Sequence, residues 1–92
     1  MSTIYKYTIE TVPQQNITMP KKARILDIQV QKDQACIWAL VDPTQETEEV
    51  LITTIGTGHD IQTNPGKYVG TYQIDNGNLV FHVFAEQDFI TN

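Results

Sequence analysis

The stretch KYVGTYQIDNGNLVFHVFA, residues 67–85, decides the fold class, because it has the pattern of two strands joined by a tight turn. Asn76-Gly77 lies at its centre, and this dipeptide favours a two-residue hairpin loop, since a type I′ turn needs positive φ at both central positions. The flanking runs, 67–74 and 79–85, are rich in β-branched and aromatic residues, which are typical of strands. The sequence therefore predicts an antiparallel hairpin.

A two-residue loop also fixes which residues of this hairpin face each other. One face is then apolar and is made of the pairs Ile74 with Leu79, Tyr72 with Phe81, and Gly70 with Val83. The other face is mixed and is made of the pairs Gln73 with Val80, Thr71 with His82, and Val69 with Phe84. A bulge would invert these faces, because side chains alternate with a period of two.

A second predicted hairpin is centred on Lys32-Asp33 and joins strands expected at 23–31 and 34–41. Its core face is made of Leu26, Ile28 and Val30 against Ala35, Ile37 and Ala39. Its reverse face is made of Gln29, Asp27 and Ile25 beside Cys36, Trp38 and Leu40. Such a mixture of apolar and hydrogen-bonding groups is expected to meet a second sheet, another subunit or a ligand.

Strand patterns also occur at 3–10 and 50–55, and a short extended piece at 17–19 stops at Pro20. The expected connections are a turn at 13–16, an acidic solvated loop at 44–49, a loop at 57–66, and a tail at 86–92 that docks through Phe89 and Ile90. No segment has helical periodicity. We therefore expect an all-β fold, a small antiparallel β-sandwich or barrel of about six to seven strands, in one domain over residues 1–92.

The composition narrows the class of partner. The 92 residues carry 11 acidic and 6 basic side chains, and the net charge of −5 argues against a nucleic-acid duplex. Cys36 is the single cysteine, so no internal disulfide forms and a reducing cytoplasm is expected. Neither a signal-peptide pattern nor a bilayer-spanning apolar run is present, so we expect a cytosolic protein without a membrane partner. A core this thin favours homo-oligomers.

Gly56-Thr57-Gly58-His59 is the most distinctive short motif and follows the strand expected at 50–55. Glycines permit positive φ and close backbone approach, so consecutive amides can point at one anion, with Thr57 adding a hydroxyl and His59 a ring donor. The plainer interpretation is a bend at a strand end with a solvent-facing histidine. Because no helix follows, the motif is neither a Walker loop nor a dinucleotide-binding turn.

Two aromatic side chains complete the candidate ligand-binding set. Trp38 is suited to stacking on a base or another planar ligand. The alternative is a tryptophan that packs in the core or at an interface. His82 donates to a ligand or, more commonly for such a histidine, to its cross-strand partner. The predicted ligand-binding residues are Trp38, Gly56, Thr57, Gly58, His59 and His82.

The sequence predicts neither a metal centre nor an enzyme. Metal-ligand residue types occur without metal-ligand spacing, at Cys36, His59, Asp60 and His82, so no metal and no cofactor is expected. The chain has no nucleophile elbow, no H-E-x-x-H run and no evident carboxylate pair, and we therefore expect no catalysis.

Several stretches together resemble a family of short, phage-encoded proteins of unassigned function, and the likeness spans nearly the whole chain. These stretches are Lys6-Tyr7, Met19-Pro20, Ala23–Leu26, Gln29–Gln31, Trp38–Asp42, Gly56–His59, Gly70-Thr71 and Leu79–Phe84. In that pattern a proline often follows the histidine of G-T-G-H, where this chain has Asp60. The resemblance implies a phage product made in a bacterial host cytoplasm, and it carries over no binding or catalytic residue.

The expected function follows from these features and from the implied setting. We expect a homo-oligomeric counter-defence protein that sequesters a small nucleotide-derived immune signal, with Gly56–His59 on phosphate and Trp38 on the base, in a pocket completed across subunits. One alternative is a protein-binding inhibitor of a host defence complex, anti-CRISPR-like, whose acidic surface mimics nucleic acid. A small structural component of the virion is another.

Overall fold

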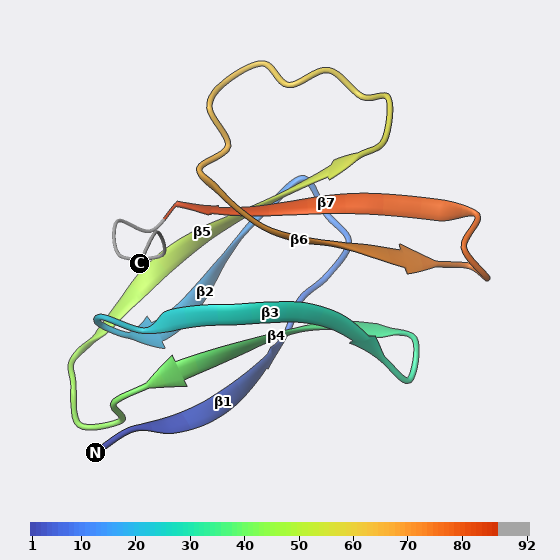
Figure 1. The fold of residues 1–92 in the computed structure, drawn as a ribbon. Coiled ribbons are helices and arrows are strands. Elements are labelled where there is room, and N and C mark those ends of the chain that lie inside the picture. Colours follow the sequence, from blue (N-terminus) through green and yellow to red (C-terminus); the bar gives the residue numbers. More distant parts are fainter. Residues whose placement is uncertain (87–92) are drawn as a thin grey trace.

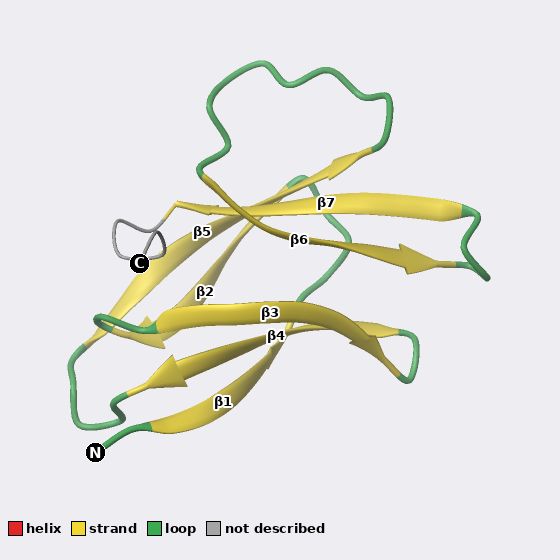
Figure 2. Cartoon of the chain, in the orientation of Figure 1, coloured by secondary structure: helices red, strands yellow, loops and turns green. Residues whose placement is uncertain are grey.

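Seven strands form two sheets that pack face to face in the computed structural model, which describes residues 1–86 (Figures 1 and 2). The strands are β1 Thr3–Thr8, β2 Gln14–Pro20, β3 Arg24–Gln31, β4 Gln34–Val41, β5 Thr47–Gly56, β6 Lys67–Ile74 and β7 Leu79–Glu86. The three-stranded sheet has the order β1-β4-β3, and the four-stranded sheet has the order β2-β5-β7-β6. The all-β prediction is confirmed, and the architecture is an open sandwich rather than a closed barrel.

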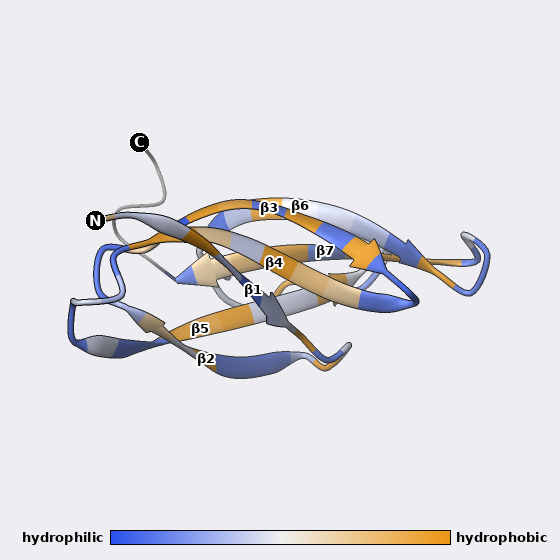
Figure 3. Ribbon diagram, turned by 90° about the horizontal axis from the view of Figure 1, so that it is seen from below, coloured by the Kyte–Doolittle hydropathy of each residue, from blue (hydrophilic) through white to orange (hydrophobic). Residues whose placement is uncertain are grey.

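The core lies between the two sheets, and alternation along the central strands builds it. On β4 the alternating buried residues are Ala35, Ile37, Ala39 and Val41. On β5 every second residue from Val50 to Thr54 is buried. Figure 3 shows the two layers, with hydrophobic stretches along β4 and β5. Each buried valine or isoleucine side chain contributes about 1.5–3 kcal/mol relative to an exposed one, so this inner layer is the main stabilising feature.

Strands β3 and β6 lie side by side and close one side of the sandwich (Figure 1). A Cβ at Gly70 of β6 would lie only 2.5 Å from Cγ2 of Ile28 on β3, so this close approach needs a residue without a side chain. The predicted β6–β7 pairs from Gly70 with Val83 to Ile74 with Leu79 are confirmed. A bulge then skips Val69, and Tyr68 takes its place opposite Phe84.

The turn of this hairpin differs from the predicted two-residue loop. Positive φ begins one residue early, with 55° at Asp75, 55° at Asn76 and 83° at Gly77. The strands end at Ile74 and resume at Leu79, so the turn spans residues 75–78. The Asn-Gly pair thus predicts the place and register of the hairpin correctly but not the detailed form of its turn.

A bulge also corrects the predicted core face of the β3–β4 hairpin. Ile28 pairs with Ile37 as predicted, but the register shifts between Ile25 and Asp27. Ile25, predicted on the reverse face, is therefore buried, whereas Leu26 is 45% exposed. The Asp27 carboxylate accepts a 2.7 Å hydrogen bond from the Ile28 N–H, and this local contact stabilises the bulged backbone.

Strands β2 and β5 are longer than the sequence predicts. Residues 14–16, expected in a turn, belong to β2, and residues 47–49, expected in the acidic loop, belong to β5. The two strands pair from Gln14 with Thr53 to Pro20 with Thr47. This non-local pairing supplies backbone hydrogen bonds that outweigh the local turn signals. The predicted docking of Phe89 and Ile90 lies outside the described residues.

Candidate functional site

The loop of residues 57–66 makes a crossover connection. Strands β5 and β6 both pair antiparallel with β7, so they run parallel to each other with β7 between them. Since the inner face of the four-stranded sheet is covered by the other sheet, the loop returns past the outward-facing Thr53 and Ile55 of β5. A functional loop held on a rigid sheet is therefore a feature of this topology.

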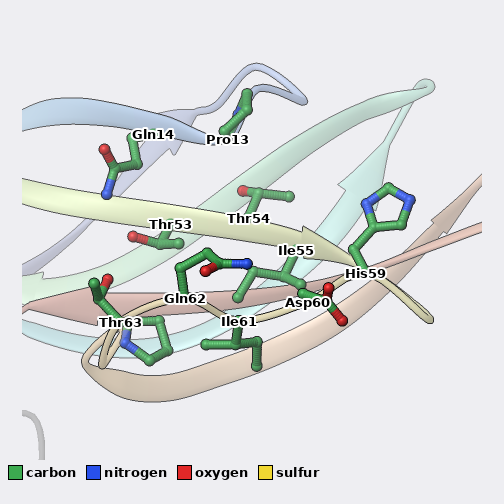
Figure 4. A pocket seen from close by; sticks show the side chains of 11 residues that line it. Pro13, Gln14, Thr53, Thr54, Ile55, His59, Asp60, Ile61, Gln62 and Thr63 are labelled. Carbon is green, nitrogen blue, oxygen red and sulfur yellow. The ribbon is translucent and has the colours of Figure 1, made fainter.

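A cavity of about 260 Å³ lies where this loop passes the end of β5 (Figure 4). Pairing of β2 with β5 stops at Gln14 and Thr53, which leaves the last residues of β5 without a neighbouring strand on that side. Figure 4 shows Pro13 and Gln14 on one side of β5 and loop residues Ile61 and Gln62 on the other. We call this space the β5–β6 cavity; its lining is Pro13, Gln14, Thr53, Thr54, Ile55, His59, Asp60, Ile61, Gln62, Thr63 and Pro65.

The G-T-G-H motif forms a β-turn at the rim of this cavity. The His59 N–H donates to the Gly56 carbonyl at 3.0 Å, and Gly58, third in the turn, has a φ of 89°. A type II turn needs positive φ at that position, which explains this glycine. A Cβ on Gly56 would lie 3.1 Å from two atoms of the His59 ring, so the first glycine lets the imidazole pack against the backbone.

His59 borders two further hollows beside the β5–β6 cavity. The inner hollow, of about 130 Å³, shares Pro13, Thr54 and His59 with the cavity and also reaches Phe81. The turn hollow, of about 360 Å³, lies on the β7 side of the motif and is lined by Gly56, Thr57, His59 and residues 78–81. The exposed His59 side chain is therefore the common wall of three adjoining spaces.

Thr57 and His82, both predicted from the sequence, are in direct contact. Thr57 Oγ1 lies 2.7 Å from His82 Nε2, and Thr71 Oγ1 lies 3.0 Å from His82 Nδ1. Tyr68 Oη lies 2.6 Å from Thr71 Oγ1, and the Thr57 hydroxyl can also donate to the Val80 carbonyl at 3.3 Å. A neutral imidazole has one donor and one acceptor, so it fits between the two threonine hydroxyls. We call Thr57, Tyr68, Thr71 and His82 the histidine network.

The histidine network holds the loop to the sheet, because it links Thr57 at the start of the loop to His82 and Thr71 on neighbouring strands. A hydroxyl beside an imidazole is the geometry of an activated nucleophile when a third group orients the ring, commonly a carboxylate. Here the second ring nitrogen faces Thr71, and no carboxylate is hydrogen-bonded to His82 within residues 1–86. His82 is hydrogen-bonded to its cross-strand partner Thr71, as one of the two interpretations of this residue predicts.

Thr54 is a candidate residue that sequence reasoning missed. Its side chain is 8% exposed, and its Oγ1 has no hydrogen-bond partner within the described part of the chain. It lines both the β5–β6 cavity and the inner hollow. The sequence does contain a signal for Thr54. Alternation along Val50, Ile52 and Thr54 places one hydroxyl on an otherwise aliphatic inner face.

A family model described as "Domain of unknown function (DUF7352)" matches residues 1–91. The chain belongs to this family. No curated protein and no solved structure shows significant similarity to it. The DUF7352 match covers the whole sandwich, the crossover loop and all the candidate residues, so they belong together in one family domain.

Two backbone N–H groups of the G-T-G-H motif in this DUF7352 domain are already hydrogen-bonded. The Thr57 N–H donates to the Val80 carbonyl at 3.1 Å, and the His59 N–H donates to the Gly56 carbonyl. An anion nest needs successive N–H groups that point outward together. The motif therefore does not present the run of free amides on which the phosphate expectation depends.

Trp38 of the DUF7352 domain lies on the far side of the sandwich from His59 and His82. It is half-buried on the outer face of the three-stranded sheet, where its register partners are Lys6 and Asp27. The Lys6 ammonium lies 5.9 Å from the Trp38 ring centroid. The core separates this face from the crossover loop, so one ligand can contact both only by bridging two chains.

Within residues 1–86 of the DUF7352 domain, no group of three or more histidine, cysteine, aspartate or glutamate side chains is placed to hold a metal ion. The same described part of the chain contains no helix of the length and apolarity that a membrane crossing requires. The structure brings together Gly56, Thr57, Gly58, His59 and His82, with Trp38 apart from them.

Proposed function

We propose that this protein binds and sequesters a small molecule without converting it, and that the β5–β6 cavity is its binding site. The observation that carries the proposal is the position of His59, which borders the cavity and both neighbouring hollows. Ligand sites are concave, about 300–1,000 Å³ in volume, and mix apolar walls with a few polar groups. The cavity of about 260 Å³ with its adjoining hollow is close to this range.

The anchoring of the loop supports a preformed site. The histidine network ties Thr57 to β7, and a Cβ on Gly66 at the other end of the loop would lie 2.5 Å from the Ala85 carbonyl oxygen. Both ends of the loop are therefore fixed on the four-stranded sheet while its middle lines the cavity. A site with fixed walls loses less conformational entropy when it binds.

Calorimetric titration with cyclic dinucleotides and ADP-ribose derivatives tests the nucleotide-derived form of this proposal, in which the protein is a phage counter-defence sponge in a host cytoplasm. The resemblance to short phage-encoded proteins supports that setting. We expect binding that Gln62→Ala weakens about tenfold and that Gln45→Ala leaves unchanged, since Gln62 lines the cavity and Gln45 lies in an exposed turn. If no compound gave a heat of binding, the nucleotide-derived form of the proposal would be wrong.

We further propose that the protein self-associates through the outer face of the three-stranded sheet. Ile4 and Leu26 are 57% and 45% exposed there beside the half-buried Trp38. Lys6 and Asp27 flank the tryptophan, so two copies related by a two-fold axis can bring opposite charges together. Leu26→Lys should reduce the native mass, and Leu79→Lys, at a site 47% exposed on the other sheet, should not.

The acidic-mimic alternative has less support from the charge arrangement. Glu46 is paired with Lys21 at 3.3 Å, and Glu49 accepts a hydrogen bond from Thr18 at 2.6 Å. The Lys21 ammonium offsets one charge of the acidic segment on which mimicry of nucleic acid would depend. Pull-down from host lysate at low and high salt tests the alternative, because a charge mimic loses its partner as salt screens the interaction.

A further inference from the structure

The Thr54 hydroxyl points to the chemistry of the ligand. Oγ1 is buried and has no hydrogen-bond partner among residues 1–86, and buried polar groups are normally paired. Thr54 stands between the β5–β6 cavity and the inner hollow, and His59 borders both. Because His59 is exposed and borders both spaces, a ligand that reaches this hydroxyl has to displace the His59 side chain. A ligand that offers a donor or acceptor there completes the pairing.

The charges around the cavity disfavour a phosphate group inside it. Among the described residues, neither lysine nor arginine lines the cavity or its two neighbouring hollows. Asp60 does line the cavity, and the chain has a net charge of −5. Phosphate binding relies on arginine, lysine or a nest of free amides, and here the amides of Thr57 and His59 are already bonded.

The remaining lining groups suit a flat, uncharged, hydrogen-bonding ring. Gln14 and Gln62 approach from opposite sides, and each amide offers both a donor and an acceptor (Figure 4). The apolar walls are Pro13, Ile55, Ile61 and Pro65. A nucleobase edge carries donors and acceptors in one plane between two apolar faces, which matches this arrangement.

We infer that the β5–β6 cavity binds an uncharged heterocycle of the nucleoside class, hydrogen-bonded to Thr54, with any phosphate of a larger ligand left outside in solvent. This inference rests on the proposed function, because it assigns a chemistry to the same site. It also reverses the expected division of roles, since the residues around the G-T-G-H turn contact the base and not the phosphate.

Calorimetry with adenosine, guanosine, cytidine and uridine and with their 5′-monophosphates tests the inference. At least one nucleoside should bind as tightly as its monophosphate or tighter. Thr54→Val removes the hydroxyl while keeping the shape of the side chain, and it should weaken that binding about tenfold. Thr47→Val, an exposed threonine on the same strand, should leave the affinity unchanged. Urea unfolding of each variant establishes that it is folded.

Three results would overturn the inference in different ways. Binding of a monophosphate at least tenfold tighter than its nucleoside would place phosphate in the site and contradict the ligand class, while leaving a binding function intact. A Gln62-dependent interaction with compounds of another class, and none with nucleosides, would also contradict the ligand class while leaving a binding function intact. If neither nucleosides, monophosphates nor a broader compound library bound, the ligand class and the proposed function would both be wrong.

Discussion

Thr57 Oγ1 lies 2.7 Å from His82 Nε2, and this contact joins the start of the crossover loop to the middle of β7. The register places Ile55 opposite His82, so the hydroxyl two residues beyond Ile55 reaches the imidazole across the strand end. The Thr57 N–H and hydroxyl both contact the Val80 carbonyl as well. One threonine thereby fixes the position from which the G-T-G-H turn extends towards the β5–β6 cavity.

Removing this hydroxyl should loosen the loop. We expect Thr57→Val to cost about 0.5–1.5 kcal/mol, the usual net value of a hydrogen bond, and to speed amide exchange over residues 57–62. Hydrogen exchange measured by mass spectrometry reports the exchange rate over this segment and the free energy of its local opening. Thr63→Val in the exposed middle of the same loop is the matched control, and equal exchange in the two variants would contradict the role of the histidine network.

The close approach of β6 to β3 depends on Gly70. Gly70→Ala puts a methyl group 2.5 Å from Ile28 Cγ2, and overpacking of this kind costs about 1–3 kcal/mol. Ile28→Ala removes the opposing methyl group, so the double variant should lose less stability than the sum of the single losses. Urea unfolding of all four proteins measures the coupling, and strict additivity would show that the two residues do not press on each other.

The unpartnered Thr54 hydroxyl should reduce the stability of the free protein. Thr54→Val replaces it with a methyl group of similar shape, and we expect the free energy of unfolding to rise by about 1 kcal/mol in the absence of ligand. Thermal unfolding of both proteins checks this value. A clear loss of stability would mean that the hydroxyl already has a partner, such as a water molecule, in the free protein.

Asp42 predicts a specific response to acid. Thr44 donates to its carboxylate from Oγ1 at 2.6 Å and from the backbone N–H at 3.0 Å, and these bonds lower the pKa of Asp42 below its ordinary value of 3.8. A lowered pKa in the folded state gives stability that is present above pH 3.8 and is lost as pH falls through the folded pKa. The stability difference between the wild type and Thr44→Ala should therefore be constant at neutral pH and shrink on acidification. A difference that grows in acid would contradict this assignment.

Local sequence signals predicted the hairpins well, because their registers depend on neighbouring residues. Asn76-Gly77 placed β6 and β7 correctly, and Lys32-Asp33, with φ of 52° and 63°, joins β3 to β4 as a tight turn. The bulge at Leu26 was missed, although the Asp27 carboxylate beside it accepts a hydrogen bond from the Ile28 backbone N–H. No local hairpin signal marked β2, because it is an edge strand whose neighbour β5 is distant in sequence.

The candidate site was predicted in its parts but not in its arrangement. The sequence singled out Gly56–His59 and His82, but only the β5–β7 pairing brings Thr57 and His82 together. The same long-range pairing separates both from Trp38, which belongs to the other sheet. Thr54 was passed over because a threonine within a β-branched run resembles ordinary strand sequence, and its lack of a partner depends on the packed structure.

The most direct test of a binding site at the crossover loop is a backbone amide spectrum of the labelled protein, titrated with a library of small polar heterocycles that includes the four nucleosides. Binding in the β5–β6 cavity predicts saturable shifts concentrated at residues 14, 53–55 and 59–64, with the amide of Trp38 unchanged. Saturable shifts confined to β1 and β4, or an unchanged spectrum with every compound, would contradict it.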